Sequence, residues 1–273
     1  MIFYSKPQLS TYTVPVALPD GASVTVVHIS DLHSDFIGNY TEDAAALITA
    51  AHPDVLVATG DLVDCRYDRI GTLFARLLEL IPPMPVIISP GNHEKRIELS
   101  RGLPEFRETC ARYGVISLDN AQTVLTVHGH GLRFFGYIQP FTSFDPHSRI
   151  DAECALLRQD ITVDDVTAAL GPCPDDAPVI LLAHDPAPFA AYAGWGAPLT
   201  LSGHIHGGGI RLPLLGGLLS PARRFFPRYC AGLYTQGTHR MIVSRGLCAS
   251  PYPRIGNPPE VAVITLVGEG APA

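Results

Sequence analysis

Short aliphatic runs recur along the chain, and five of them end in a cluster of polar residues. The sequence reads VTVVHIS before DLH, DVLVAT before GDLVD, PVIIS before PGNHE, PVILLA before HDP, and PLTLS before GHIH. Helix-like segments separate several of these runs, at roughly Glu42–Ala51, Ile70–Ile81, Pro104–Tyr113 and Pro186–Ala193. Strands that alternate with helices predict βαβ units. Because the runs are continuously apolar, we expect strands that are covered on both faces.

Other apolar segments predict further strands. STYTVPVAL and SVTVVHIS flank PDGA near the start, which predicts a hairpin. QTVLTVHGHGLRFFGY, over 122–137, predicts a second hairpin with HGHG at its turn, and HRMIVS and EVAVITL predict two late strands. No segment has the composition of a linker. We therefore expect one domain over residues 1–273, with two packed sheets and helices outside them.

Composition narrows the class of protein. The chain has 273 residues, of which 47% are hydrophobic, and this is enough for the core of one large α/β domain. No apolar stretch is as long as a membrane-spanning helix, and the N-terminus lacks the pattern of a signal peptide. Six scattered cysteines form no C-x-x-C pair. Together these features predict a cytoplasmic protein with reduced thiols.

Charge is unevenly distributed along the chain. The formal net charge is −7, yet residues 186–259 contain seven arginines and no lysine, aspartate or glutamate. These arginines either pair with acidic residues elsewhere or face an anionic substrate. Because arginine binds phosphate through two hydrogen bonds, Arg211 and Arg245 are our candidate phosphate contacts.

Residues 207–259 are the part of this region that we expect to face the substrate or to form a lid. The stretch LLGGLLSPARRFFPRY mixes aliphatic residues, two phenylalanines and three arginines. This pattern is typical of an ordinary packed loop, or of a lid that touches a lipid tail or a membrane surface. Its proline, glycine and aliphatic content suits a compact lid better than a surface that tracks nucleic acid.

The five polar clusters predict a metal site. Ligands of open α/β sheets bind beyond the carboxyl ends of the strands, so the fold would bring these clusters together. Carboxylates, an amide oxygen and imidazoles are together typical ligands of divalent cations. Two neighbouring cations need a shared anionic ligand, and Asp61, which follows Gly60 in a tight turn, is the natural one. Taken alone, the pair in GHIH would rather indicate two solvated loop histidines, or a strand edge with both rings on one face.

The same blocks resemble a known family. D-x-H at 31–33, G-D-x-x-D at 60–64, G-N-H-E at 91–94, His184 and G-H-x-H at 203–206 resemble, in this order, the calcineurin-like metallophosphoesterases. The stretches GGGIRLPLLGGLLSPARRFFPRYCAGLY, MIVSRGL and NPPEVAVITL resemble a bacterial subgroup of small phosphodiesterases. That subgroup includes membrane-associated members similar to UDP-2,3-diacylglucosamine pyrophosphatase, and commonly has Gln where this chain has Gly209.

The resemblance implies a four-layer α/β/β/α sandwich and two divalent metal ions, of which Mn is our expectation and Fe or Zn are alternatives. One metal would be bound by Asp31, His33, Asp61 and His206. The other would be bound by Asp61, Asn92, His184 and His204. His93 would be the general acid, and Asp64 would orient it, although an aspartate at this place is also a favoured helix N-cap.

The implied reaction is hydrolysis of an anionic phosphoester by a hydroxide that bridges the two metals, in a phosphodiesterase or pyrophosphatase. The substrate would then be a small phosphodiester or a lipid-linked sugar nucleotide, and peripheral membrane contact would follow from the latter. Alternatives are a non-catalytic scaffold of the same fold, a phosphomonoesterase or a nuclease. Retention of every metal position and of His93 favours an enzyme. In the phosphoprotein phosphatases of this family, Arg-Gly follows G-D-x-x-D directly, whereas Cys65 and Arg66 follow it here. The arginine is displaced by one position, and a phosphoprotein phosphatase is therefore disfavoured. The sequence defines no oligomeric state.

Overall fold

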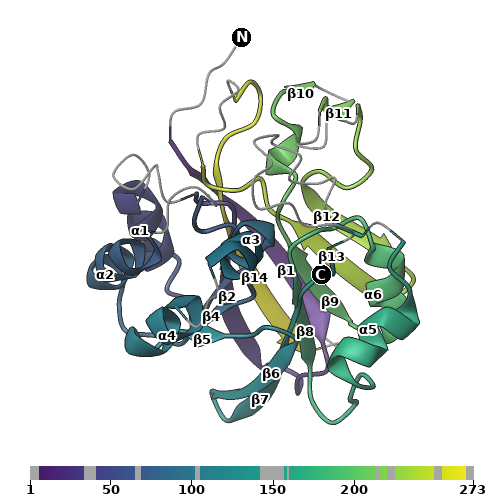
Figure 1. Cartoon of the computed structure of the whole chain (residues 1–273). Helices are drawn as coiled ribbons and strands as arrows, with labels where there is room; N and C mark the ends of the chain where they lie inside the picture. Colours follow the sequence, from purple (N-terminus) through teal and green to yellow (C-terminus); the bar gives the residue numbers. More distant parts are fainter. Residues whose placement is uncertain are drawn as a thin grey trace.

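Two six-stranded mixed sheets lie face to face in the computed structural model of the protein (Figure 1). The structure describes residues 6–33, 41–64, 69–101, 105–141, 157–158, 160–212, 215–219, 225–248 and 254–268. The first sheet has the order β1 (Gln8–Val16), β14 (Glu260–Gly268), β2 (Ser23–Ile29), β3 (Val55–Ala58), β4 (Val86–Ile88) and β5 (Ile116–Ser117). The second has the order β12 (Gly232–Gln236), β13 (His239–Val243), β9 (Leu199–Ser202), β8 (Val179–Ala183), β7 (His130–Tyr137) and β6 (Ala121–Val127).

Helices cover the outer face of each sheet. The first sheet packs against α1 (Thr41–Ala50), α2 (Ile70–Leu80), α3 (Asn92–Arg101) and α4 (Glu105–Arg112). The second packs against α5 (Val163–Leu170) and α6 (Phe189–Trp195). A small hairpin of β10 (Arg211–Leu212) and β11 (Gly216–Gly217) follows the 3₁₀ turn His206–Gly208. The expected four-layer α/β/β/α sandwich is therefore confirmed.

The layers follow from the burial pattern of the sequence. Every residue of β3, β8 and β9 is buried, as expected for strands between a helix layer and a second sheet. The core between the sheets includes Val57, Phe134 and Leu182. In α2, Ile70, Leu73, Phe74 and Leu77 are buried, at the spacing of one helix face. None of the described helices is long and apolar enough to span a membrane.

The first predicted hairpin is wrong. Strand β1 pairs in parallel with β14, from Gln8 opposite Glu260 to Val16 opposite Gly268. Strand β14 in turn pairs antiparallel with β2, so the last strand of the chain lies between the first two. Turn residues show only that the chain reverses, and they do not exclude a third strand from entering between the two arms. The second predicted hairpin, β6 with β7, is confirmed.

Two helices were not predicted. Helix α3 (NHEKRIELSR) is strongly polar and shows only Ile97 as a buried apolar side chain among its described residues, so it has no apolar periodicity. Helix α5 is short but begins with a capping box between Thr162 and Asp165, which is a recognisable sequence signal. Helix α6 begins three residues after the predicted start, because Pro186 and Pro188 disfavour helical backbone in the residues before them.

The inter-sheet core provides a test of the fold. We expect Phe134→Ala to lower the free energy of unfolding by about 3–5 kcal/mol, because Phe134 is fully buried and its removal leaves a cavity. Val124→Ala on the neighbouring strand is the control, since Val124 is 49% exposed and its loss should change stability by less than about 0.5 kcal/mol. Urea unfolding measures both. Equal effects of the two substitutions would contradict this location of the core.

Candidate metal centre

Six strand ends, three from each sheet, converge at one edge of the sandwich. From the first sheet, Asp31 follows β2, Asp61 follows β3 and Asn92 follows β4. From the second sheet, His184 follows β8 and the pair His204 and His206 follows β9. The loop after β13 is the sixth. Because parallel strands end at the same edge, residues far apart in sequence lie together here.

The side chains form two groups that share one carboxylate. Ligand atoms of Asp31, His33 and Asp61 lie within 4.8 Å of one another, and so do those of Asp61, His184 and His204. In the second group, His184 Nε2 is 3.0 Å from Asp61 Oδ2 and 3.1 Å from His204 Nδ1. We call these the first and second ligand groups. Asp61 is thus the residue that the two groups share.

The remaining predicted site residues border these groups. His206 Nε2 lies 3.6 Å from Asp31 Oδ1, beside the first group. His93 Nε2 is 3.8 Å from Asp61 Oδ2, and the His93 ring meets the His33 ring edge-on at 4.6 Å between centroids. Polar atoms of His33, Asp64 and His93 lie within 4.8 Å of one another. Asp64 is therefore close enough to interact with either imidazole.

The backbone of the site is strained. Asp31, His33, Asp61, His204 and His206 all have positive φ, between 45° and 72°. Such backbone costs on the order of 1–3 kcal/mol per residue and persists only where surrounding contacts enforce it. Hydrogen bonds from the Asp31 amide to the Gly60 carbonyl and from the His33 amide to the Asp61 carbonyl, each 3.0 Å, connect two of these loops. Strain concentrated at five candidate ligands points to function.

Glu94 holds the loops after β3 and β4 together. Its buried carboxylate accepts backbone N–H groups from Gly91 (2.8 Å), Asp61 (2.8 Å), Leu62 (2.7 Å) and Val63 (3.2 Å). Burial and the charge of Asp61 raise the pKa of Glu94, while these N–H donors favour its ionised form. Glu94 therefore has a structural role.

Two glycines allow the loops to approach the carboxylates. A Cβ at Gly91 would lie 2.3 Å from Asp61 Oδ1, and one at Gly203 would lie 2.5 Å from Asp31 Oδ2. No side chain fits in either place without displacing a candidate ligand. The glycines of PGNHE and SGHIH thus belong to the architecture of the site.

The buried charges are arranged for a cation. Burial raises the pKa of Asp31 to about 6, although His184 opposes the shift. Burial lowers the pKa of His184, but Asp61 and Asp31 outweigh it and raise this pKa to about 10. In the metal-free site, the raised pKa of His184 therefore favours its protonated form. A metal ion that bound to this imidazole would displace the proton. A bound divalent cation would also stabilise both carboxylates in their ionised form.

The donor atoms fit a divalent metal. Asn92 Oδ1 is buried and accepts no hydrogen bond from the described residues, as a metal-binding amide oxygen would. His184 Nδ1 donates to the Thr59 carbonyl at 2.5 Å, which directs Nε2 toward Asp61. Carboxylate, amide and imidazole donors suit Mn, Fe or Zn, so the residues fit the metals that the resemblance implies.

The two predicted phosphate contacts lie at the border of the site. Arg211 Nη1 is 3.4 Å from the Gly207 carbonyl and 3.4 Å from Cys230 Sγ. Arg245 lies beside Tyr12, whose pKa its charge lowers against the larger effect of burial. No contact recorded among the described residues joins either arginine to the ligand groups. Their role in binding phosphate stays a prediction, and Cys65 and Arg66 lie outside the described residues.

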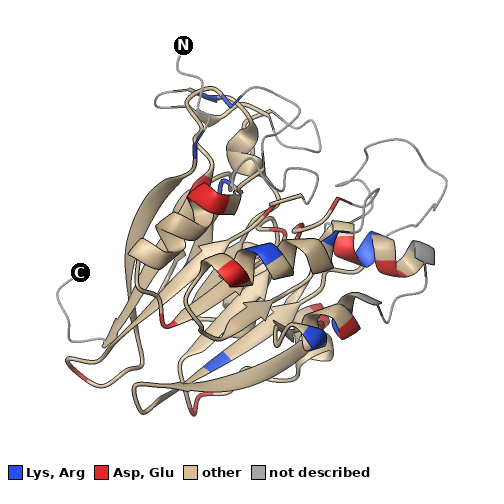
Figure 2. Ribbon diagram, turned by 90° about the vertical axis from the view of Figure 1, so that its left-hand side faces the viewer, with Lys and Arg blue, Asp and Glu red and all other residues tan. Residues whose placement is uncertain are grey.

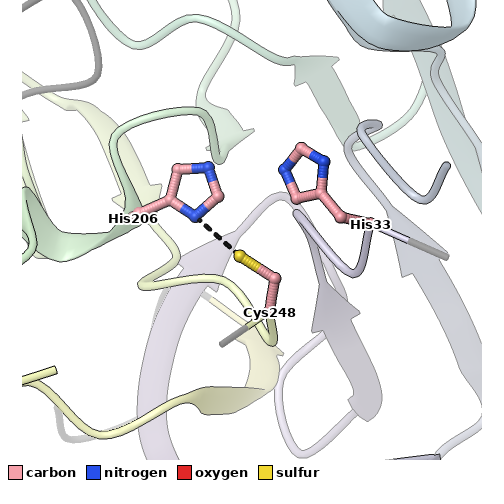
Figure 3. A group of neighbouring side chains, drawn as sticks. All are labelled: His33, His206 and Cys248. Atoms are coloured by element: carbon pink, nitrogen blue, oxygen red, sulfur yellow. Dashed lines mark hydrogen bonds between the residues drawn. The ribbon is translucent and has the colours of Figure 1, made fainter. Parts of the chain in front are cut away.

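Sequence reasoning missed an outer layer of the site. Arg254 is buried and donates to three backbone carbonyls of the loop after β13, those of Arg245, Gly246 and Cys248. Asn257 donates to the carbonyls of His206 (2.7 Å) and Gly209 (2.9 Å). Cys248 lies against the His206 ring (Figure 3). One signal was available, because HRMIVS is a strand-like run that ends in a loop like the five others.

Comparisons with known proteins agree with this geometry. The calcineurin-like phosphoesterase family matches residues 24–208. The chain is 27% identical to an uncharacterized metallophosphoesterase of Aquifex aeolicus, over 96% of this chain and 93% of that protein. It is 25% identical to the phosphodiesterase YaeI of Escherichia coli, over 91% and 84% of the two chains.

Two further similarities concern the domain and the fold. A Danio rerio protein named as a transmembrane protein with metallophosphoesterase domain is 27% identical over 86% of this chain, which covers 51% of that protein. The crystal structure of phosphopantetheinyl hydrolase from Mycobacterium tuberculosis has a TM-score of 0.54 and 17% identity, covering 93% of this chain and all of that chain. This last likeness supports the fold alone.

The structural role of Glu94 can be tested. Glu94→Gln replaces an acceptor of four N–H groups by an amide whose own N–H₂ would face two of them, because each carboxylate oxygen accepts two. We expect the free energy of unfolding to fall by about 1–3 kcal/mol, since buried donors lose their partner. Glu79→Gln is the matched control, because the Glu79 side chain is 69% exposed and pairs only with Arg76 among its recorded ion pairs. Denaturant titration of both variants measures this change. An unchanged free energy of unfolding in Glu94→Gln would contradict the structural role.

Proposed function

Since the chain belongs to the calcineurin-like phosphoesterase family, a family of metal-dependent phosphoester hydrolases, we propose that it is a dinuclear phosphodiesterase or pyrophosphatase. The observation that carries this proposal is the shared position of Asp61, which lies in both ligand groups. A carboxylate can bind two cations through its two oxygens, whereas a neutral imidazole binds one through its lone pair. Asp61 therefore favours a metal pair over a single ion.

We assign the ligands as the sequence predicts. Asp31, His33, Asp61 and His206 would bind one metal, and Asp61, Asn92, His184 and His204 the other. When bound, such a pair polarises the phosphoryl oxygens and lowers the pKa of a coordinated water. The metals remain Mn, Fe or Zn, since all three accept oxygen and nitrogen ligands, and Mn is our choice for the first tests.

His93 is our candidate general acid. It lies on the Asp61 side of the first ligand group, at the start of α3, where Glu94 fixes the backbone beside it. From this position its imidazole would donate a proton to the oxygen that leaves phosphorus. Asp64 would hold the ring in the required orientation. Because every predicted ligand and this acid converge at one edge, a catalytic role is favoured over a non-catalytic scaffold.

A small pocket beside the second ligand group is lined by Asn92, His184, Tyr137, Phe141 and Tyr192. Tyr137 and Tyr192 are almost completely buried, and the pocket is too small for the organic part of a substrate. The preference for a diester or pyrophosphate over a simple monoester therefore rests on the similarity to the phosphodiesterase YaeI and on the resemblance of the sequence to small phosphodiesterases.

We also propose that the β10–β11 hairpin contacts an anionic lipid surface. Leu212, Leu215, Phe225 and Phe226 are between 38% and 70% exposed. Phe225 forms an isolated antiparallel β-bridge with Leu219, and the Phe226 amide donates to the Leu218 carbonyl. Both phenylalanines therefore lie beside the hairpin. Large apolar side chains that stay exposed mark interaction surfaces, and bilayers accept them together with basic residues.

Charge supports an anionic bilayer as the partner. The hairpin belongs to the region over 186–259 that lacks acidic residues, and Figure 2 shows no red at the height of this hairpin near the top of the molecule. The exposed Arg228 lies nearby in sequence. The Leu219 amide donates to the Gly208 carbonyl at 3.2 Å, and Gly208 lies only two residues after the candidate ligand His206. A lipid-linked substrate anchored at the hairpin would therefore have its phosphate close to the metal centre.

Metal-dependent diester hydrolysis is the first test. Metal-free protein would be loaded with Mn²⁺, Zn²⁺ or Fe²⁺ and assayed on a phosphomonoester, a phosphodiester and a UDP-linked acyl sugar. We expect turnover of the diester or the sugar nucleotide, reduced about 10²–10⁴-fold in His93→Ala because the general acid is lost. His128→Ala, which removes an imidazole that is largely exposed, is the control. Metal binding without turnover of any substrate would favour the scaffold.

Vesicle binding tests the lipid contact. We expect the protein to cosediment with vesicles of phosphatidylglycerol and phosphatidylcholine, and less with phosphatidylcholine alone. The double substitution Phe225→Ser and Phe226→Ser should weaken binding about 100-fold or more, since each ring contributes roughly 1.5–3 kcal/mol when buried. Val124→Ser removes an equally exposed apolar side chain from another surface. Equal binding by both variants would overturn the proposal.

A further inference from the structure

Cys248 contacts a candidate metal ligand on the side away from the metal. Its Sγ lies 3.2 Å from His206 Nδ1 (Figure 3). Nε2 of the same ring lies 3.6 Å from Asp31 Oδ1. The side chain is buried, and its sulfur lies within 4.8 Å of a ring nitrogen of His33 as well. The two nitrogens of an imidazole point in widely divergent directions. One faces the first ligand group and the other faces the thiol.

We propose that Cys248 is a positioning residue that fixes the tautomer and orientation of His206. A neutral imidazole carries its proton on one nitrogen. When Nδ1–H donates to the sulfur, the lone pair of Nε2 is left for the metal, and the ring cannot rotate without losing the hydrogen bond. This inference rests on the proposed function, because it concerns how the first ligand group binds its metal.

The sulfur is itself held firmly in place. The Cys248 amide donates to the Asp31 carbonyl at 2.8 Å, and its carbonyl accepts from Arg254 Nε at 2.8 Å. Asn257 holds the backbone carbonyl of His206 at 2.7 Å. The loop after β13 is therefore fastened to two ligands of the same group, Asp31 and His206. A thiol in this loop acts on the first group through defined contacts rather than through general packing.

The second ligand group is held differently. There, His184 Nδ1 donates to a backbone carbonyl, that of Thr59, at 2.5 Å. Thiol sulfur is a weaker acceptor than a carbonyl oxygen. Because the two histidines have separate outer partners, removal of the thiol should affect one metal and spare the other. A loss of general stability would weaken the binding of both metals.

Metal titration of the full chain is the decisive experiment. Metal-free wild type, Cys248→Ala, Cys248→Ser and Cys110→Ala would be titrated with Mn²⁺ in a calorimeter. We expect two binding steps in the wild type, and in Cys248→Ala one step weakened about 10–100-fold with the other unchanged. Cys248→Ser should recover most of the affinity, because its hydroxyl also accepts a hydrogen bond. Cys110 is a buried thiol in the helix layer over the first sheet, so Cys110→Ala controls for loss of a buried sulfur.

Nitrogen NMR of the metal-free protein tests the tautomer directly. Long-range ¹H–¹⁵N correlations should show the Nδ1–H form of His206 in the wild type and in Cys248→Ser, and a mixture of tautomers in Cys248→Ala. This readout does not depend on activity or on metal. Thermal unfolding of each metal-free variant verifies that it is folded.

Three outcomes would overturn the inference. Equal weakening of both steps would show a structural role, and unchanged affinity with an unchanged tautomer would show none. A sulfur-to-metal charge-transfer band in the near ultraviolet of the Co²⁺-loaded wild type, absent from Cys248→Ala, would make Cys248 a direct ligand instead. A wild type that binds no metal would overturn the proposed function, whereas the NMR result would still decide whether Cys248 sets the tautomer.

Discussion

Two carboxylates buried at the meeting edge of the two sheets are the constraint on which the rest of the structure depends. Asp31 and Asp61 are almost completely inaccessible to solvent, and removal of a charge from water is costly unless it is paired. A third buried acid, Glu94, adds to this charge, but its oxygens accept four backbone N–H groups. Asp31 and Asp61 have fewer such donors and face imidazoles instead. Their stability therefore depends on positive charge supplied at the site.

The strained loops follow from this requirement. Five candidate ligands have left-handed backbone, and two glycines leave no room for a side chain beside Asp31 and Asp61. Such a cluster would be less favourable in a site without a metal ion, because a protonated His184 would then be the main group that offsets the charge of the two buried carboxylates. Stability and function are thus linked at this edge. The large inter-sheet core beside this edge, in which Phe134 and Leu182 are fully buried, contributes free energy of folding that offsets the strain.

The sequence predicts which residues gather at this edge because its signal is local. Each predicted ligand follows an apolar run by a few residues, and the parallel sheet brings such ends together. Contacts that depend on distant partners were not predictable in this way. Strand β14 enters between β1 and β2, and the contact of Cys248 with His206 joins residues 42 positions apart. Helix α3 was missed because its charged sequence carries no apolar period, although it begins at the candidate ligand Asn92. Local pattern predicts the candidate ligands, whereas only the fold shows which residues contact them.

The sign of the charge differs between the buried edge of the sandwich and the region over 186–259. The interior edge is negative, and cations bound there would turn it into an electrophilic centre. The region over 186–259 contributes arginines and no acidic residue to the elements around that centre. An anionic phosphoester that approached past the β10–β11 hairpin, as proposed, would meet no carboxylate from this region before it reached the candidate metal site. Basic surface at a cleft raises the rate at which anions enter. Had acidic residues surrounded the opening, the same buried carboxylates would still bind metal, but the substrate would be repelled before reaching it. The absence of acidic residues from about a quarter of a net acidic chain is accordingly as relevant to the proposed reaction as the candidate ligands themselves.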